Sequence, residues 1–248
     1  VNFAYNKVTN KSAYQGKLSL NTFDLGKYFN DEKNFGTVSL QTKIKGGGLT
    51  LESLRAELEG EVSSITLLNH QYQDIDINGF VLKKSFSGDL HLNDDNLKMD
   101  FSGRVDLSKE IPEFKFNADV KYINFKALNV LKNDFKISGK IKSDFAGLKV
   151  DDILGRVDFS NLVLTRDTIE SYVNYASVDV KSLPGNKKLF EIKSDFLEGE
   201  VDGNFNYKDL PKAFVRFAKE TFTRDFVDTT TLANQDFHFD IRIFEPND

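Results

Sequence analysis

The stretch Leu97-Lys98-Met99-Asp100-Phe101-Ser102-Gly103-Arg104-Val105-Asp106-Leu107 alternates apolar or small residues with polar ones at every position. A period of two separates the two kinds of side chain, because successive side chains of a β-strand point to opposite faces. The same alternation returns in residues 114–122, 137–145, 199–207 and 237–243. The sequence therefore predicts half-buried antiparallel strands with one apolar face and one face in water.

Short polar segments between the alternating runs have the composition of hairpin loops. Asn93-Asp94-Asp95-Asn96 and Leu183-Pro184-Gly185-Asn186 are the clearest examples. They predict a meander of roughly ten to twelve strands, many longer than the usual five or six residues. The fold class we expect is mainly β: an elongated, curved antiparallel sheet with a few short helices.

Helix-like spacing is rare and falls at the ends of predicted strands. Short helices are expected over residues 24–29, 125–131 and 151–154. A longer amphipathic helix is predicted from Asp209, with Pro211 in its first turn, where a missing N–H is harmless. Its polar face carries the basic residues Lys212, Arg216 and Lys219. We expect that face to lie in solvent.

The chain repeats itself loosely with a period of about 100 residues. Phe23-Asp24-Leu25 resembles Phe125-Lys126-Ala127-Leu128, and Gly48-Leu49-Thr50-Leu51 resembles Gly147-Leu148-Lys149-Val150. The glycine-containing strand around Gly103 resembles the one around Gly203. We expect a first unit over residues 1–124, a second over 125–222 and the start of a further unit over 223–248. Stacked β units of this kind form elongated structures.

Composition excludes several classes of protein. The 248 residues include no Cys, so neither a disulfide scaffold nor a thiolate metal site is available. The net charge of -5 argues against nucleic-acid binding, which usually needs a basic surface. No apolar run reaches the ~20 residues of a membrane-spanning helix. The chain begins with Val, and we expect it to be a piece of a longer protein.

No arrangement of residues predicts catalysis, a metal or another cofactor. The only histidines, His70, His91 and His238, have no zinc-site or triad spacing. Gly46-Gly47-Gly48 is not followed by the Lys-Ser/Thr of a phosphate loop. Asp94-Asp95 and Asp151-Asp152 lack calcium-loop spacing and are interpreted as turn and cap residues. We expect no enzyme.

The run from Gly88 to Leu107, followed by Ile111-Pro112-Glu113-Phe114-Lys115-Phe116-Asn117-Ala118-Asp119-Val120, resembles the repeat region of TamB-like proteins. These translocation and assembly module proteins belong to the wider AsmA-like group, and the likeness is strongest to versions from the Bacteroidota. Residues 196–222 are similar to another recurring part of that family. The resemblance rests on the order of repeated segments, since no catalytic motif is involved.

The resemblance implies a U-shaped β-sheet with an apolar groove in the periplasm, anchored to a membrane in the full-length protein. Such a groove would hold phospholipid acyl chains on their way between the two membranes, or assist outer-membrane protein assembly with an Omp85-type barrel. The inward positions expected to line it are Leu90, Leu92, Met99, Phe101, Val105, Phe114, Phe116, Val120, Ile137, Ile141, Phe145, Val201 and Phe205. The alternatives are a β-rich surface or adhesion module with a closed core and, less favoured, a carbohydrate-active enzyme.

Overall fold

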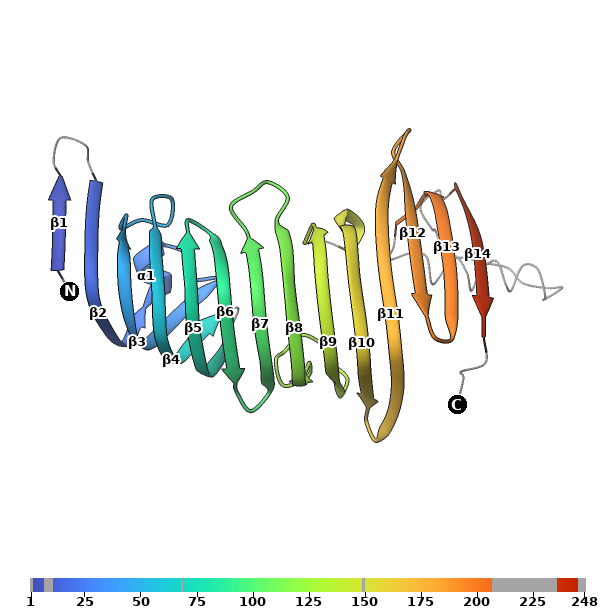
Figure 1. Ribbon diagram of the computed structural model, residues 1–248, viewed down its shortest axis with the longest axis horizontal. Coiled ribbons are helices and arrows are strands. Elements are labelled where there is room, and N and C mark those ends of the chain that lie inside the picture. Colours follow the sequence, from blue (N-terminus) through green and yellow to red (C-terminus); the bar gives the residue numbers. More distant parts are fainter. Residues whose placement is uncertain (1, 7–10, 68, 149, 207–235, 245–248) are drawn as a thin grey trace.

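The computed structural model describes residues 2–6, 11–67, 69–148, 150–206 and 236–244. Within these residues, fourteen strands form a single sheet in which each strand pairs only with its neighbours in the chain. All of these pairs are antiparallel. The sheet is long and curved, with β1 at one end and β14 at the other (Figure 1).

The strands and helices have the following bounds. The strands are β1 Asn2–Asn6, β2 Lys11–Asp24, β3 Phe35–Gly47, β4 Arg55–Leu67, β5 His70–Leu82, β6 Ser85–Asn93, β7 Leu97–Asp106, β8 Glu113–Asn124, β9 Phe135–Ala146, β10 Leu154–Arg166, β11 Ile169–Leu183, β12 Lys187–Ser194, β13 Leu197–Asn204 and β14 Asp236–Ile243. The helices are α1, Leu25–Phe29, and the 3-10 turn η1, Val150–Asp152.

The predicted fold class is confirmed, and so are both hairpin loops, because strands end at Asn93 and Leu183 and resume at Leu97 and Lys187. The expected number of strands was too low. β4 escapes a simple search for alternation, because Ser63-Ser64 interrupts its pattern where the pairing with β3 shifts.

Two of the predicted helices differ from the structure. Residues 25–29 do form α1, whose first turn is capped by Asp24: its carboxylate accepts the Lys27 N–H at 2.9 Å. Residues 125–131 form a turn instead, which ends at Asn129 in the left-handed conformation with φ 60°. In the third segment η1 is a 3-10 turn, and Leu154 already begins β10. The helix expected from Asp209 lies outside the described residues.

The long strands bend where the register of the sheet shifts. β2 shifts against β3 between Leu20 and Phe23, where Thr22 is left-handed with φ 48°. The Thr22 N–H donates to the Ser39 hydroxyl at 2.9 Å instead of to a backbone carbonyl of the neighbouring strand. An extra residue of this kind bends a strand and increases its twist. β10 has the same feature at Asn161, with φ 52°.

Several of these local features recur one hundred residues later. The shift between Leu20 and Phe23 has a counterpart between Val120 and Ile123 of β8. The Asp24 cap has one in Asn124, whose side-chain oxygen accepts the Ala127 N–H at 3.1 Å. Strand lengths repeat too: β2–β5 have 13 or 14 residues and β8–β11 have 12 to 15, whereas β6, β7, β12 and β13 have 8 to 10. The division into units at 124/125 and 222/223 stays a prediction.

Each short pair of strands carries an aspartate that holds the longer strand before it. β5 pairs with β6 only from Ile75 onward, so the Gln73 N–H extends beyond the end of β6. The buried carboxylate of Asp94, in the β6–β7 turn, accepts that N–H at 3.0 Å and the Asn96 N–H at 2.8 Å. Asp195 does the same for Asn174 of β11, at 2.9 Å, and this bond lowers the pKa of Asp195.

The core lies on the apolar face along the line of the bends. Val38, Val62, Ile75, Leu92 and Leu97 form a buried cluster that runs from β3 to β7. Leu128, in the turn after β8, completes this cluster, and Leu25 of α1 packs against it. The two connections therefore cover the face on which the bent strands pack.

Replacing Asp94 by Ala should lower the free energy of unfolding by about 2 kcal/mol, because two backbone N–H groups lose their buried acceptor. Urea unfolding followed by circular dichroism measures the change. The neighbouring Asp95 is exposed and serves as the control, with an expected change below about 0.5 kcal/mol for Asp95→Ala. Equal losses in the two variants would contradict the proposed clamp.

Candidate functional site

One row of side chains crosses the apolar face from β2 to β14 without interruption. In this row, called the apolar ladder below, each residue is the cross-strand partner of the next. Its members are Tyr14, Gly46, Ala56, Val81, Phe86, Val105, Phe114, Phe145, Gly155, Val180, Phe190, Val201 and Phe239. Every side chain of the ladder is apolar except for the hydroxyl of Tyr14, and Gly46 and Gly155 carry no side chain, so the ladder is an apolar strip with a glycine at two positions.

The lining residues predicted in β6–β9 and β13 lie on this face, in the ladder or in the rows parallel to it. Phe205 lies just after β13 and packs with Val201. Five are core residues, namely Leu92, Phe101, Val120, Val201 and Phe205, which are 2 to 7% exposed. The other eight are half-buried: Leu90, Met99, Val105, Phe114, Phe116, Ile137, Ile141 and Phe145. A guest molecule could touch the second group directly, whereas the first group supports it from beneath.

Glycines in the middle of the sheet allow close approach of neighbouring residues. Gly79, Gly88 and Gly103 are direct neighbours on β5, β6 and β7. A Cβ on Gly79 would lie 2.6 Å from the Phe86 ring, and one on Gly103 would lie 2.5 Å from Cβ of Phe116. The space beside these glycines is therefore taken by the protein itself. Their role is close packing.

Buried hydroxyls interrupt the apolar face at Thr42 and Ser143, and the Ser143 hydroxyl donates to the Phe116 carbonyl at 3.5 Å. Thr42 of β3 is 4% exposed and lies two rows from the ladder, opposite Leu18 and Gly60. Among the described residues its hydroxyl has no hydrogen-bond partner. An unpaired buried hydroxyl lowers the free energy of unfolding, so a substitution at Thr42 tests whether water reaches this part of the apolar face.

The two long edges of the sheet meet near its first end. β3 has 13 residues and would span about 43 Å if straight. α1 precedes β3 and Leu49 follows it, yet the Tyr28 hydroxyl of α1 donates to the Leu49 carbonyl at 2.9 Å. The bent strand thus brings its two ends together, and α1 crosses the apolar face as a strap.

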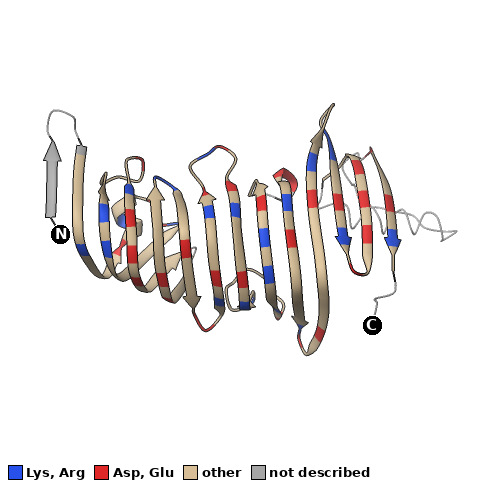
Figure 2. Ribbon diagram, in the orientation of Figure 1, with Lys and Arg blue, Asp and Glu red and all other residues tan. Residues whose placement is uncertain are grey.

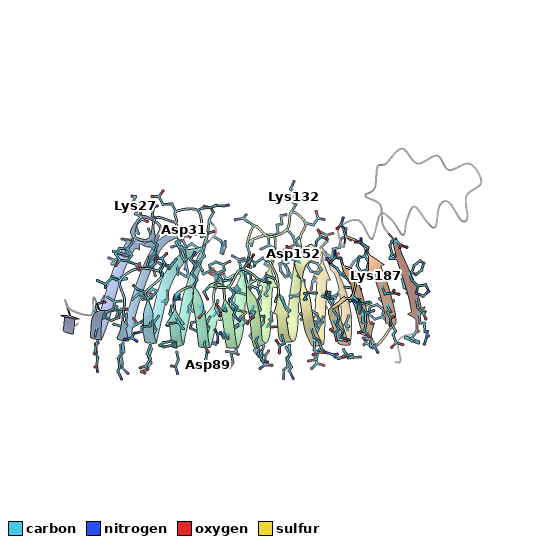
Figure 3. All side chains as sticks on the ribbon, turned by 90° about the horizontal axis from the view of Figure 1, so that it is seen from above. Lys27, Asp31, Asp89, Lys132, Asp152 and Lys187 are labelled. Carbon is cyan, nitrogen blue, oxygen red and sulfur yellow. The ribbon has the colours of Figure 1, made fainter. Side chains whose placement is uncertain are left out.

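Aromatic contacts fill the space around this strap. The ring centroid of Tyr28 lies 5.5 Å from that of Phe23 and 5.1 Å from that of Phe29. The ring centroids of Phe29 and Phe35 are 6.0 Å apart. Tyr14, below them, donates to the Gly48 carbonyl at 3.1 Å. Burial raises the pKa of Tyr14, and the nearby Tyr28 raises it further. The apolar face is consequently closed over β2–β4. In Figure 3, α1 with Lys27 and Asp31 lies on the opposite side of the sheet from Asp89.

Charged residues of both signs are spread along the strands (Figure 2), and those at the exposed alternate positions lie on the outer face of the sheet. An open depression of about 1200 Å³ lies there between two rows of polar side chains. Asp89 and Asp100 are among its acidic residues, and Lys140 and Lys142 lie at its basic end. Cross-strand ion pairs such as Lys43–Glu59, at 2.9 Å, occupy part of this face. Sequence reasoning did not single out the depression, because it needs the register of nine strands.

Titratable groups of the outer face have structural partners. The Asp106 carboxylate accepts bonds from Ser108 and Arg104, which lower its pKa from 3.8 to about 2. Its stabilising effect is therefore present above pH 4 and disappears as the pH falls towards 2. His91 contacts Asp100 at 2.6 Å and His238 contacts Asp202 at 3.4 Å, both in exposed positions.

The described residues contain neither a metal-binding cluster nor a membrane-spanning helix. No group of three or more His, Cys, Asp or Glu in this part of the chain could hold a metal ion. No described helix has the length and apolar character needed to cross a membrane. Asp94, interpreted above as a turn residue, does have that role.

Comparisons with known proteins identify no relative. No protein-family model, no curated protein and no solved structure matches the chain.

Sequence reasoning missed part of this face. The ladder members Tyr14, Ala56, Val81, Phe86, Val180 and Phe190 were absent from the predicted lining. The alternation around Val81 and Val180 was a usable signal. Nothing in the sequence indicated that Tyr28 reaches Leu49, because that contact depends on the bend in β3.

Replacing Thr42 by Val should raise the free energy of unfolding by about 1 kcal/mol, because the unpaired hydroxyl leaves the apolar face. Thr37→Val on the same strand, at an exposed position, should change it much less. Chemical denaturation compares the two. A loss of stability in Thr42→Val would mean that the hydroxyl has a partner, such as a bound water.

The Asp31 N–H donates to the Gly26 carbonyl within the strap. Replacing Tyr28 by Phe should speed amide exchange of Asp31 by about three- to tenfold. The reason is that one hydrogen bond of about 1 kcal/mol is lost. Hydrogen–deuterium exchange measures the effect. Tyr172→Phe removes a similarly exposed hydroxyl, bonded to Glu170, and should leave α1 unchanged. Unaltered exchange in Tyr28→Phe would show that the hydroxyl bond does not hold the strap.

Proposed function

We propose that this chain holds phospholipid acyl chains along its apolar face, as a length of a TamB-like or AsmA-like protein. The observation that carries the proposal is the apolar ladder, which continues from β2 to β14 on one face of an open sheet. Each acyl CH₂ removed from water gains about 0.8 kcal/mol. A continuous apolar strip offers that gain at every step along its length.

The half-buried residues of β7–β9 are the proposed contact surface. Phe114 and Phe145 stack with ring centroids 4.8 Å apart, and Phe116 lies 5.1 Å from Phe101. These rings offer no hydrogen bond that would trap a headgroup. A lipid would move along them with small barriers, as transport requires.

The strap limits where the proposed path can lie. Because α1 closes the face over β2–β4 and Leu128 covers the core cluster of β3–β7, an acyl chain would lie on the half-buried residues of β7–β9 and on the strands that follow. Within the same proposal, the chain lies in the periplasm and the full-length protein acts with an Omp85-type barrel. Both of these points come from the resemblance in sequence, as does the alternative client, an outer-membrane protein during assembly.

A second candidate function has an observation in its favour. Phe101, Val120, Val201 and Phe205 are at most 7% exposed, which is typical of a closed core. If the half-buried residues close in the same way, the chain is a β-rich surface or adhesion module without a lipid site. The experiment below separates the two functions.

Replacing Phe116 by Asp should reduce phospholipid binding at least tenfold, because a charge in the row next to the apolar ladder repels acyl chains. Lipid extraction and native mass spectrometry of the purified 248-residue chain measure bound lipid. Transfer of a fluorescent phospholipid between vesicles measures function. Asn117→Asp places the same charge on the outer face of the same strand and should leave both unchanged.

Thermal unfolding of each variant separates loss of binding from loss of fold. If Phe116→Asp unfolds, the milder Phe145→Asn tests the same strip at another half-buried position. Wild-type protein that neither carries nor transfers phospholipid would overturn the proposal and favour the closed module. Equal effects of Phe116→Asp and Asn117→Asp would overturn it as well.

A further inference from the structure

The end of the strap α1 is held at the far end of β3 by an exposed hydrogen bond. The Tyr28 hydroxyl donates to the Leu49 carbonyl at 2.9 Å, and Tyr28 is 52% exposed. A neutral bond in such a position contributes little to stability, because water competes for both of its groups. This contact can therefore break while the strands of the sheet stay paired.

The backbone just before the strap is strained. Thr22 is left-handed with φ 48°. This conformation is unfavourable for a β-branched residue and persists only where the surrounding structure holds it in place. The Ser39 hydroxyl, which accepts the Thr22 N–H, and the last two residue pairs between β2 and β3 hold it here. Movement of the strap away from the sheet would relieve the strain.

The second unit covers its part of the core without either feature. The 125–131 turn, which corresponds to α1, places Leu128 in the core. None of its residues carries a hydroxyl that could bond to the opposite edge. No residue between Val120 and Ile123, at the corresponding register shift of β8, is left-handed. Covering the core therefore requires neither the Tyr28 bond nor the strained residue, and both are particular to the strap.

We propose that α1 is a gate over β2–β4, which the Tyr28 bond holds closed and the strain before α1 favours opening. α1 precedes β3 and Leu49 follows it, so the closed strap runs along the whole strand. Thr42, near the middle of β3 on the apolar face, is 4% exposed, and the ladder member Ala56 of β4 is 1% exposed. An open gate uncovers both.

The opening of the gate is a property of the strap alone. What it admits rests on the proposed function: an acyl chain would reach the first strands of the apolar ladder, which the closed strap covers. The two statements are tested by separate measurements.

A single thiol beneath the strap reports opening, because the chain contains no Cys. Thr42→Cys introduces this thiol, and its rate of reaction with a maleimide measures how often the gate opens. Tyr28→Phe in the same background should raise the rate about three- to tenfold. Ser143→Cys is the matched control, at a hydroxyl of β9 that is 3% exposed and lies beyond the strap. Tyr28→Phe should leave its rate within about twofold.

Circular dichroism shows whether each variant is folded, and Ala56→Cys serves as the reporter if Thr42→Cys is not. An unchanged rate beneath the strap in Tyr28→Phe would overturn the gate. Equal acceleration at Ser143→Cys would overturn it too, since the whole sheet would then be opening.

A phospholipid with a photoreactive diazirine in one acyl chain tests what the gate admits. After irradiation, mass spectrometry of the digested protein locates the cross-links. We expect cross-links on β7–β9 in every folded variant, and cross-links on β2–β4 that increase at least about threefold in Tyr28→Phe. Cross-links confined to β7–β9 would overturn the admission of lipid by the gate. No cross-link on any strand would overturn the proposed function, while the thiol rates would still decide whether the gate opens.

Discussion

The structure depends on one constraint: every strand finds its hydrogen-bond partners in the strands just before and just after it. In such a sheet each interface is local, so stability is close to a sum of neighbouring contacts, as in repeat proteins. Register then determines everything else. Because pairing is continuous from β1 to β14, the cross-strand pairs determine on which face and in which row each side chain lies.

The bends turn the regularly paired strands into a curved sheet. They arise where the regular pairing fails, at Thr22, Asn161 and the shift after Val120. At the ends of the short strands, Asp94 and Asp195 take the N–H groups that pairing leaves over. The same polar devices recur at nearly the same interval. The features that curve the sheet therefore occur twice along the chain, although few of the residues that create them are identical.

The two faces have separate roles in the proposals made above. The apolar face combines a buried core with half-buried rings, and α1 closes it at one end through the Tyr28–Leu49 bond. The outer face holds its charges in ion pairs that suit a surface in water. The row next to the ladder is apolar at the second end of the sheet as well, through Ile192, Gly199 and Ile241.

The sequence by itself determined the strands of β7, β8, β9 and β14, the loop at Asp94 and the helix capped by Asp24, because alternation and capping are local properties. It also placed Phe116, Ile141 and Phe145 on one face. The correspondence of Gly103 with Gly203 stays a prediction; both glycines have positive φ and lie opposite a phenylalanine, Phe116 and Phe237. Only the tertiary structure decided which inward residues are core, that residues 125–131 form a turn, and that the sheet closes at α1. Those outcomes depend on how far each strand bends, and that bend is set by contacts between residues far apart in the chain.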